Sequence, residues 1–191
     1  MRGLYAITPE GAGLVAKVRS ALEGGIALLQ YRRKRGTLEE VKAIARLAHE
    51  HGVPLIINDD VELALKVGAD GAHLGRDDGD LPAARKKLSG KILGASCYDR
   101  LELARSAVAA GADYVAFGSV FASPTKPQAV RAPLSLFKND LGVPLCAIGG
   151  ITLANAPQAI AAGADLLAVI SDVFDAPDIA ARCRAYGKLF G

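Results

Sequence analysis

The chain has 191 residues, a formal net charge of +3, three cysteines and no tryptophan. This length predicts one domain, residues 1–191, with enough chain to bury a sizeable core. The charge is small, and the five tyrosines and five phenylalanines are scattered, which argues against the basic, aromatic-rich face of a nucleic-acid-binding protein.

The cysteines and apolar runs indicate where the chain resides. Cys97, Cys146 and Cys183 are far apart and have no CxxC spacing, as is usual for reduced intracellular proteins. The segment MRGLYAITPE has no long apolar run, and no later segment approaches the roughly 18 apolar residues of a membrane span. We therefore expect a cytoplasmic protein that binds neither membrane nor nucleic acid.

A short phrase recurs four times, at residues 24–29, 68–73, 111–116 and 163–168. Each copy follows an alanine-rich amphipathic segment and opens an apolar run, as expected for a helix that stops at glycine before a strand buried on both faces. The copies are about 43 to 52 residues apart, which is the length of two βα units. Four such double units predict an α/β fold, a (β/α)8 TIM barrel.

The expected elements follow from this repeat. Strands are predicted at 4–7, 26–31, 54–58, 71–74, 92–95, 114–118, 144–148 and 166–170. Helices are predicted at 12–23, 38–51, 61–67, 80–88, 99–110, 134–140, 153–162 and 176–188. A doubly wound open sheet is the competing fold, although no GxGxxG follows the first strand.

Residues 119–133, after the sixth strand, form a connection much longer than a usual βα loop. A long polar loop at the carboxyl end of a barrel is often a lid over a substrate. A surface insertion without function is the alternative.

Two acidic clusters end neighbouring strands, NDD at 58–60 and DD at 77–78. Adjacent parallel strands lie about 4.8 Å apart, so Asp59 and Asp78 can share one hard cation such as Mg²⁺. The alternative is that Asp59 or Asp60 caps the following helix and that Asp77 and Asp78 are solvated.

Polar groups at other strand ends complete the predicted rim. In strand 2, Gln30, Arg32 and Lys34 alternate and can point into the mouth, where they suit a diphosphate bound with Mg²⁺. Ser96 follows strand 5, and strand 6 leads to Ser123, Thr125 and Lys126.

A second anion site is predicted after the last two strands, from Gly149 and Gly150 and from Ile170 and Ser171. This pattern indicates phosphate but no particular reaction. His73 lies inside strand 4, where a packed, hydrogen-bonded histidine is favoured over a catalytic base.

Taken together, the chain resembles the thiamine phosphate synthase family along essentially its whole length. The motifs that carry the resemblance are QYRRK (30–34), NDD (58–60), HLGRDD (73–78), GAS (94–96), SPTK (123–126), IGGI (148–151) and VIS (169–171). The family joins a hydroxymethylpyrimidine diphosphate to a thiazole phosphate and releases pyrophosphate. That reaction is thought to pass through a stabilised pyrimidine cation, which needs no strong base.

The resemblance also implies roles for individual residues. Asp59 and Asp78 correspond to Mg²⁺ ligands. Pyrimidine-diphosphate contacts are implied for Gln30, Arg32, Lys34, Asn58, Ser96 and Lys126, of which Arg32, Lys34, Ser96 and Lys126 are the expected catalytic residues. Thiazole-phosphate contacts are implied for Ser123, Thr125, Gly150, Ile170 and Ser171.

The chain departs from the family pattern at Ser123, where Thr is common, at Arg76, where Gln is usual, and at Arg33, where Glu is usual. A related thiazole tautomerase, which binds no diphosphate, and a non-catalytic barrel that binds thiamine phosphates are the alternatives. A homodimer is expected from the small size and the apolar helices.

Overall fold

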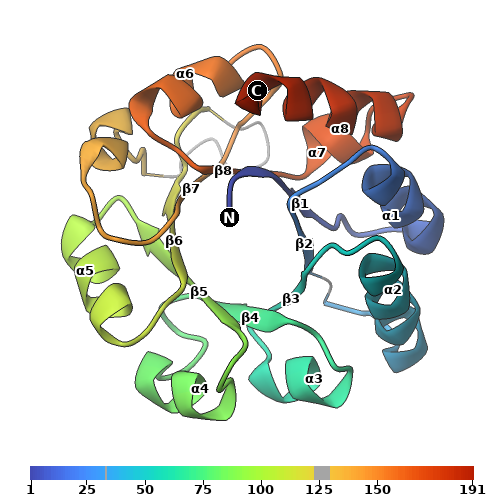
Figure 1. The fold of residues 1–191 in the computed structure, drawn as a ribbon, viewed down its shortest axis with the longest axis horizontal. Helices are drawn as coiled ribbons and strands as arrows, with labels where there is room; N and C mark the ends of the chain where they lie inside the picture. Colours follow the sequence, from blue (N-terminus) through green and yellow to red (C-terminus); the bar gives the residue numbers. More distant parts are fainter. Residues whose placement is uncertain (33, 123–129) are drawn as a thin grey trace.

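The structure is a computed structural model that describes residues 1–32, 34–122 and 130–191. Its centre is a closed barrel of eight parallel strands in sequence order, in which β8 pairs with β1 (Figure 1). The strands are β1 (Gly3–Ile7), β2 (Leu28–Tyr31), β3 (Leu55–Asn58), β4 (Gly71–Leu74), β5 (Ile92–Tyr98), β6 (Tyr114–Gly118), β7 (Leu145–Ile148) and β8 (Leu166–Val169). The predicted (β/α)8 barrel is therefore confirmed, and the open sheet is wrong.

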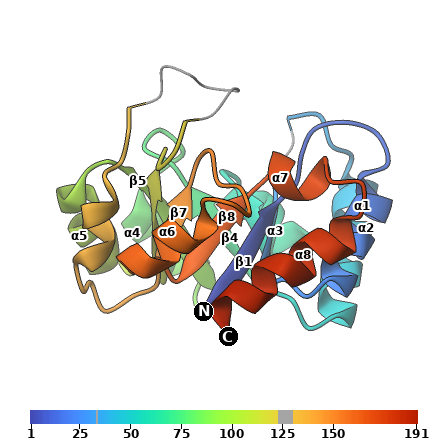
Figure 2. The same ribbon diagram turned by 90° about the horizontal axis from the view of Figure 1, so that it is seen from above.

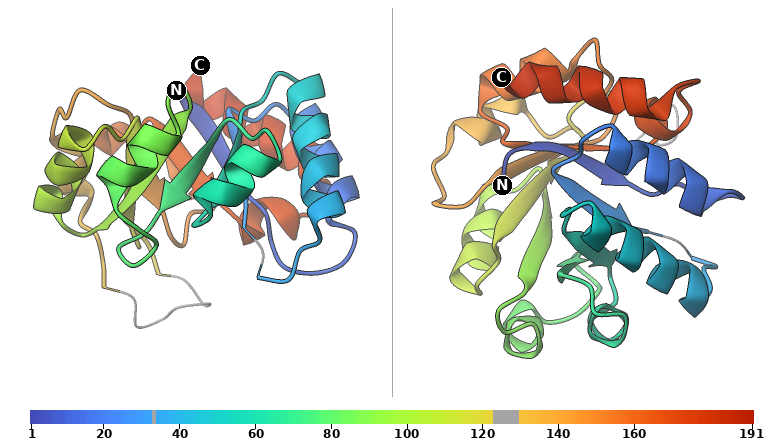
Figure 3. Two further views of the ribbon diagram at one scale, coloured as in Figure 1. Left: turned by 90° about the horizontal axis from the view of Figure 1, so that it is seen from below. Right: turned by 45° about the vertical axis from the view of Figure 1, so that its right-hand side comes forward.

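Helices form a ring around the barrel (Figures 1 and 3). They are α1 (Leu14–Glu23), α2 (Leu38–Glu50), α3 (Val61–Lys66), α4 (Leu81–Lys87), α5 (Leu101–Ala109), α6 (Ala156–Ala162), α7 (Ser171–Phe174) and α8 (Ile179–Gly187), with 3₁₀ helices η1 (Leu134–Lys138) and η2 (Lys188–Phe190). Within the described residues, no helix has the length and apolarity needed to cross a membrane.

Both chain ends lie at the end of the barrel where the strands begin (Figure 2). Arg2 ties them together, since its Nη1 donates to the carbonyl oxygen of Phe190 at 2.8 Å. The carboxyl ends of the strands form the opposite rim, where the chain enters α7. This rim is the end at which barrel enzymes place their active sites.

Several predicted element bounds differ from the structure. The helix expected at 134–140 is the shorter 3₁₀ helix η1, and α7 was not predicted because four residues are too few to show a helical period. Strand β5 continues to Tyr98 through a register shift after Ser96. Such bulges often re-aim a side chain beside a functional site.

Strand side chains alternate between two cores. One core fills the barrel interior and includes Tyr5, Leu28, Ile56, Tyr114 and Cys146. Their neighbours along the strands point outward and pack against the helices in a larger second core. Because both faces are buried, the strands have continuous apolar runs rather than an alternating pattern.

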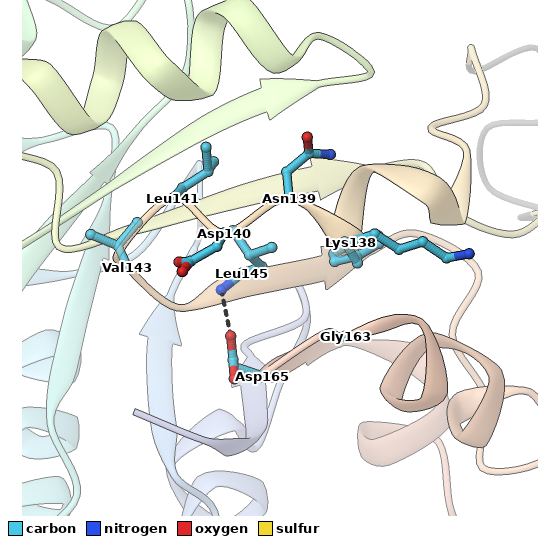
Figure 4. Close-up of a pocket in the computed structure, with 9 residues that line it drawn as sticks. Lys138, Asn139, Asp140, Leu141, Val143, Leu145, Gly163 and Asp165 are labelled. Carbon is cyan, nitrogen blue, oxygen red and sulfur yellow. Dashed lines mark hydrogen bonds between the residues drawn. The ribbon is translucent and has the colours of Figure 1, made fainter.

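The repeated phrase has a structural explanation at the amino end of the barrel. In three copies the aspartate just before a strand accepts an N–H from the start of the preceding strand, at 2.8 to 2.9 Å: Asp70 from Leu55, Asp113 from Leu93, and Asp165 from Leu145. Figure 4 shows the last of these bonds. Each aspartate also donates its own N–H to the carbonyl oxygen of the same residue. These reciprocal hydrogen bonds fix the register of neighbouring strands, so the repeated phrase has a structural role in the barrel.

Candidate active site

Two carboxylates meet at the rim, from the ends of adjacent strands. Asp59 follows β3 and Asp78 lies in the loop after β4, and the two carboxyl groups are close enough for Asp78 to raise the pKa of Asp59. The pKa of Asp59 is raised to about 6, first because partial burial removes water from the carboxylate and next because Asp78 lies beside it. Asp59 also has a positive φ of 64°, a conformation that is uncommon outside glycine and is often found at functional sites.

Neither carboxylate of this pair caps a helix. Asp60 is the cap of α3, because its Oδ1 accepts the N–H of Leu63 at 2.8 Å, and Asp80 is the cap of α4. Asp78 accepts the N–H of Gly75 at 2.9 Å through Oδ2, which fixes its loop. A cavity of about 270 Å³ between α3 and α4 is lined by both Asp59 and Asp78.

Arg32 is the first cation of the rim, and Thr8 fixes the position of its backbone. The Oγ1 of Thr8, a buried residue just after β1, accepts the N–H of Arg32 at 2.8 Å. The positive charge of Arg32 lowers the pKa of both Asp59 and His73, so Arg32 lies beside the carboxylate pair. Thr8 was not predicted, because the contact joins residues that only strand pairing brings together.

Two further predicted residues extend this side of the rim. The backbone N–H of Lys34 donates to Glu10 at 2.9 Å, and the Nδ2 of Asn58 donates to the carboxylate of Asp59. The structure thus brings together Arg32, Asn58, Asp59 and Asp78, which were predicted from strands 2, 3 and 4.

Below the rim, a chain of hydrogen bonds crosses the barrel interior. It runs from Gln30 Nε2 to Tyr5 Oη at 2.6 Å, to Tyr114 Oη at 2.7 Å, to His73 Nδ1 at 2.9 Å, and from His73 Nε2 to Ser96 Oγ at 2.8 Å. Burial lowers the pKa of His73 to about 4 and raises that of both tyrosines. His73 is therefore neutral near pH 7, and the prediction of a packed, hydrogen-bonded histidine is confirmed.

The predicted second anion site is built from the ends of β7 and β8. Gly150 has a φ of 64°, and a Cβ at this position would lie 2.3 Å from the carbonyl oxygen of Ala122. Only glycine fits this turn, which Asn155 supports by donating from Nδ2 to the Gly150 carbonyl at 2.9 Å. Ile170 and Ser171 open α7 immediately after β8.

Asp172, which was not predicted, connects these two loops. Its Oδ2 accepts the N–H of Leu153 at 3.1 Å and the hydroxyl of Tyr186 at 2.7 Å. Its Oδ1 pairs with Arg182 at 2.8 Å. The loop after β7, the start of α7 and helix α8 are therefore held by one carboxylate.

Some predicted residues lie outside the described part of the chain: Arg33, Ser123, Thr125 and Lys126, together with the rest of residues 123–129 of the predicted lid. The departure at Arg76 is described, and its guanidinium lies 4.8 Å from the centre of the Tyr98 ring. This cation–π contact directs the Arg76 charge to the end of β5.

The donor set at the rim suits a hard cation. No group of three or more His, Cys, Asp or Glu side chains is gathered for a metal anywhere in residues 1–32, 34–122 or 130–191. Mg²⁺ requires few protein carboxylates, since water and substrate phosphates supply the remaining oxygens. The pair of Asp59 and Asp78 therefore fits Mg²⁺ better than zinc, which prefers four protein ligands in structural sites.

A closed barrel with this rim defines the chain as a (β/α)8-barrel enzyme. A family profile described as thiamine monophosphate synthase matches residues 4–173, and the chain belongs to this family.

Individual relatives agree with that assignment. A protein named thiamine-phosphate synthase from Aromatoleum aromaticum is 59% identical, over 100% of this chain and 97% of its own. One of the same name from Chromobacterium violaceum is 55% identical, over 100% and 97%. The solved thiamine phosphate pyrophosphorylase of Pyrococcus furiosus superposes with a TM-score of 0.86 at 35% identity, over 98% of this chain and 94% of its own. A 3-hexulose-6-phosphate synthase, at 19% identity and a TM-score of 0.76, shares the fold.

Proposed function

We propose that this chain is a thiamine phosphate synthase: it joins 4-amino-2-methyl-5-hydroxymethylpyrimidine diphosphate to 4-methyl-5-(2-phosphoethyl)thiazole and gives thiamine phosphate and pyrophosphate. The observation that carries the proposal is that Asp59 and Asp78 line one cavity at the carboxyl rim, with the charge of Arg32 near Asp59. The match of the whole chain to relatives that bear this name supports the same reaction.

Asp59 and Asp78 would hold Mg²⁺ in this scheme. The ion, when bound, supplies positive charge that stabilises the diphosphate as it leaves. Asp78 raises the pKa of Asp59, and a cation bound between the two carboxylates would remove this repulsion, because its positive charge takes the place of a proton on Asp59.

The remaining residues of this subsite would bind and orient the pyrimidine diphosphate. Arg32, Lys34 and Lys126 supply cations for its phosphate oxygens, and Ser96 and Asn58 supply neutral donors. Gln30, which lies in β2 two residues before Arg32, would contact the pyrimidine ring.

No general base is needed for this reaction. The carbon–oxygen bond to the diphosphate breaks with its electron pair on the oxygen, and the lone pair of the thiazole nitrogen forms the new carbon–nitrogen bond. No proton moves between the reacting atoms. The burial of the neutral His73 inside the barrel is in keeping with a site whose work is electrostatic.

The thiazole phosphate would bind at the second subsite, through Ser123, Thr125, Gly150, Ile170 and Ser171. The turn at Gly150 allows backbone N–H groups to approach phosphate oxygens closely. Asp172 would hold this subsite together from below, since it joins the two loops that form it.

The test mixes the purified protein with both phosphorylated substrates, with Mg²⁺ or with EDTA, and measures thiamine phosphate. We expect product only with Mg²⁺. Equal turnover in EDTA would remove the metal from the scheme, isomerisation of the thiazole without coupling would indicate a tautomerase, and binding without turnover would indicate a sensor.

We also propose that the enzyme is cytoplasmic, that its partners are small molecules rather than nucleic acid or membrane, and that it is a homodimer. Sedimentation at several protein concentrations tests the last point, and a single species with the mass of one chain would exclude the dimer.

A further inference from the structure

The hydrogen-bonded residues Gln30, Tyr5, Tyr114, His73 and Ser96, called the interior chain below, cross the barrel from β2 to β5. Its two ends are residues proposed to contact the pyrimidine diphosphate, and its three middle members are not assigned to any ligand. Tyr5, Tyr114 and His73 are 1%, 0% and 7% exposed, so all three middle members lie in the barrel interior rather than at the rim.

The interior chain allows two directions of hydrogen bonding, and the Gln30 amide, which donates from Nε2, selects one of them. The Nε2 of Gln30 has only hydrogens to offer, so the Tyr5 oxygen accepts and its own hydrogen goes to Tyr114. The Tyr114 hydrogen then goes to the Nδ1 of His73, which leaves the His73 proton on Nε2. That proton is donated to the Ser96 oxygen. The hydroxyl hydrogen of Ser96 is therefore available to a ligand.

The opposite direction would change both ends at once. It requires the Gln30 amide to turn so that its oxygen accepts from Tyr5, and it ends with Ser96 donating to His73. The Ser96 oxygen would then present only its lone pairs, and no hydrogen, to an anionic ligand. A phosphate oxygen at Ser96 thus stabilises the first direction, which also fixes the amide orientation of Gln30 at the other end.

Packing alone does not explain these residues. A tyrosine hydroxyl inside a barrel costs free energy unless it is hydrogen-bonded, whereas phenylalanine and leucine fill the same volume without that cost. The hydroxyls of Tyr5 and Tyr114 lie among apolar groups such as Leu28, Ile56 and Cys146. Among residues 1–32, 34–122 and 130–191, each of these hydroxyls has hydrogen-bond partners only along the interior chain.

We propose that Tyr5, Tyr114 and His73 are positioning residues for the coupling reaction, which set Ser96 as a hydrogen-bond donor to the diphosphate and fix the Gln30 amide that meets the pyrimidine. This inference rests on the proposed function, because it assigns no ligand of its own. It adds that the two ends of the pyrimidine-diphosphate subsite are coupled through the barrel interior.

The test is a double-mutant cycle between Tyr114→Phe and Ser96→Ala, measured as kcat/KM for the pyrimidine diphosphate. We expect Tyr114→Phe to lower this value about 10-fold in the wild-type background and less than about 2-fold in the Ser96→Ala background, since the link then has nothing to position. The KM for the thiazole phosphate should stay within about 2-fold. An equal loss in both backgrounds would overturn the proposal.

Cys146→Ala is the matched control. Cys146 is fully buried in the same interior core but is not a member of the interior chain. Its truncation should lower stability and leave kcat/KM within about 2-fold. A 10-fold activity loss in Cys146→Ala would show that any disturbance of this core has the same effect, which contradicts a specific role of Tyr114.

A second measurement does not depend on the folding of any variant. Ring-¹⁵N NMR of the histidine-labelled wild-type protein, with Mg²⁺ and pyrophosphate present, reports which nitrogen of His73 carries the proton. The proposal requires the proton on Nε2, and a proton on Nδ1 overturns it. If the wild type does not form thiamine phosphate, the proposed function fails. If it forms the product but the effects of Tyr114→Phe and Ser96→Ala are independent of each other, only this inference is overturned.

Discussion

Asp59 and Asp78 lie beside each other at the rim although 18 residues separate them in the sequence. Their proximity follows from the barrel, because β3 and β4 are adjacent and both end at the same rim. Asp60 takes the helix-capping role at the start of α3, which leaves Asp59 available for a cation. The proposed metal site requires that Asp60 caps α3 and that Asp59 is free of this role.

Asp59→Asn and Asp60→Asn form a matched pair that tests this requirement. Asparagine tolerates the positive φ of Asp59 and also caps helices well, so both variants should fold. We expect Asp59→Asn to lower the coupling rate about 100-fold or more, since it removes charge that holds the metal. Asp60→Asn should stay within about 3-fold of wild type. Similar losses in the two variants, measured as steady-state product formation, would contradict the assignment.

The metal-free protein should gain stability when Asp59 is replaced by Asn. The pKa of Asp59 is raised to about 6 in the folded state, from its ordinary value of 3.8. A raised pKa favours folding below about pH 4, and that contribution is lost as the pH rises through 6. Above pH 6 the charged pair therefore costs stability, about 1 kcal/mol after allowance for its partial exposure to water.

The measurement is thermal unfolding of both proteins in EDTA and in Mg²⁺. In EDTA at about pH 8 the variant should melt at a higher temperature than wild type, and near pH 4 this difference should vanish. Mg²⁺ should stabilise the wild type and leave Asp59→Asn unchanged. Stabilisation of both proteins by Mg²⁺ would place the ion elsewhere.

Burial of His73 predicts a separate pH dependence of stability. Its folded pKa is about 4, against the ordinary histidine value of 6.5, so the unfolded chain binds the proton first as the pH falls. The contribution is present above 6.5 and is lost between about 6.5 and 4. Wild type should lose about 2 kcal/mol more than His73→Gln between about pH 7 and 4.5, as measured by urea unfolding. Parallel curves would show that His73 is not buried as a neutral group.

The aspartates of the repeated phrase should matter to the fold alone. Asp165 accepts the N–H of Leu145 at 2.9 Å, at the end of the barrel opposite the rim (Figure 4). Asp165→Ala leaves that N–H without its acceptor and should cost about 1 to 3 kcal/mol of unfolding free energy. Asp165→Asn keeps a carbonyl oxygen and should cost less, and both variants should keep wild-type kcat/KM. An activity loss larger than the stability loss explains would contradict this separation.

The sequence predicted the barrel because its signals are local. Glycine stops, apolar runs and the repeated aspartate lie within a few residues of each other, and each reports one strand or one turn. The rim could also be predicted, since the carboxyl ends of all eight strands must face the same way once the barrel closes.

Contacts between distant strands were not predictable in the same way. Tyr5 and Tyr114 are 109 residues apart, and nothing near either one shows that their hydroxyls meet. Asp172 is a similar case, because its partners come from the loop after β7 and from α8. A polar ring in the middle of an otherwise apolar strand was the available signal for the tyrosines, since buried hydroxyls need partners.

The most direct test of the central claim is the position of one divalent cation. Crystals grown with Mn²⁺ and pyrophosphate, measured at the manganese absorption edge, locate the ion without regard to activity. We expect one anomalous peak at the rim, from an ion that is coordinated by oxygen atoms of both Asp59 and Asp78 and by the pyrophosphate. A peak that contacts only one of these carboxylates, or neither, would contradict the claim.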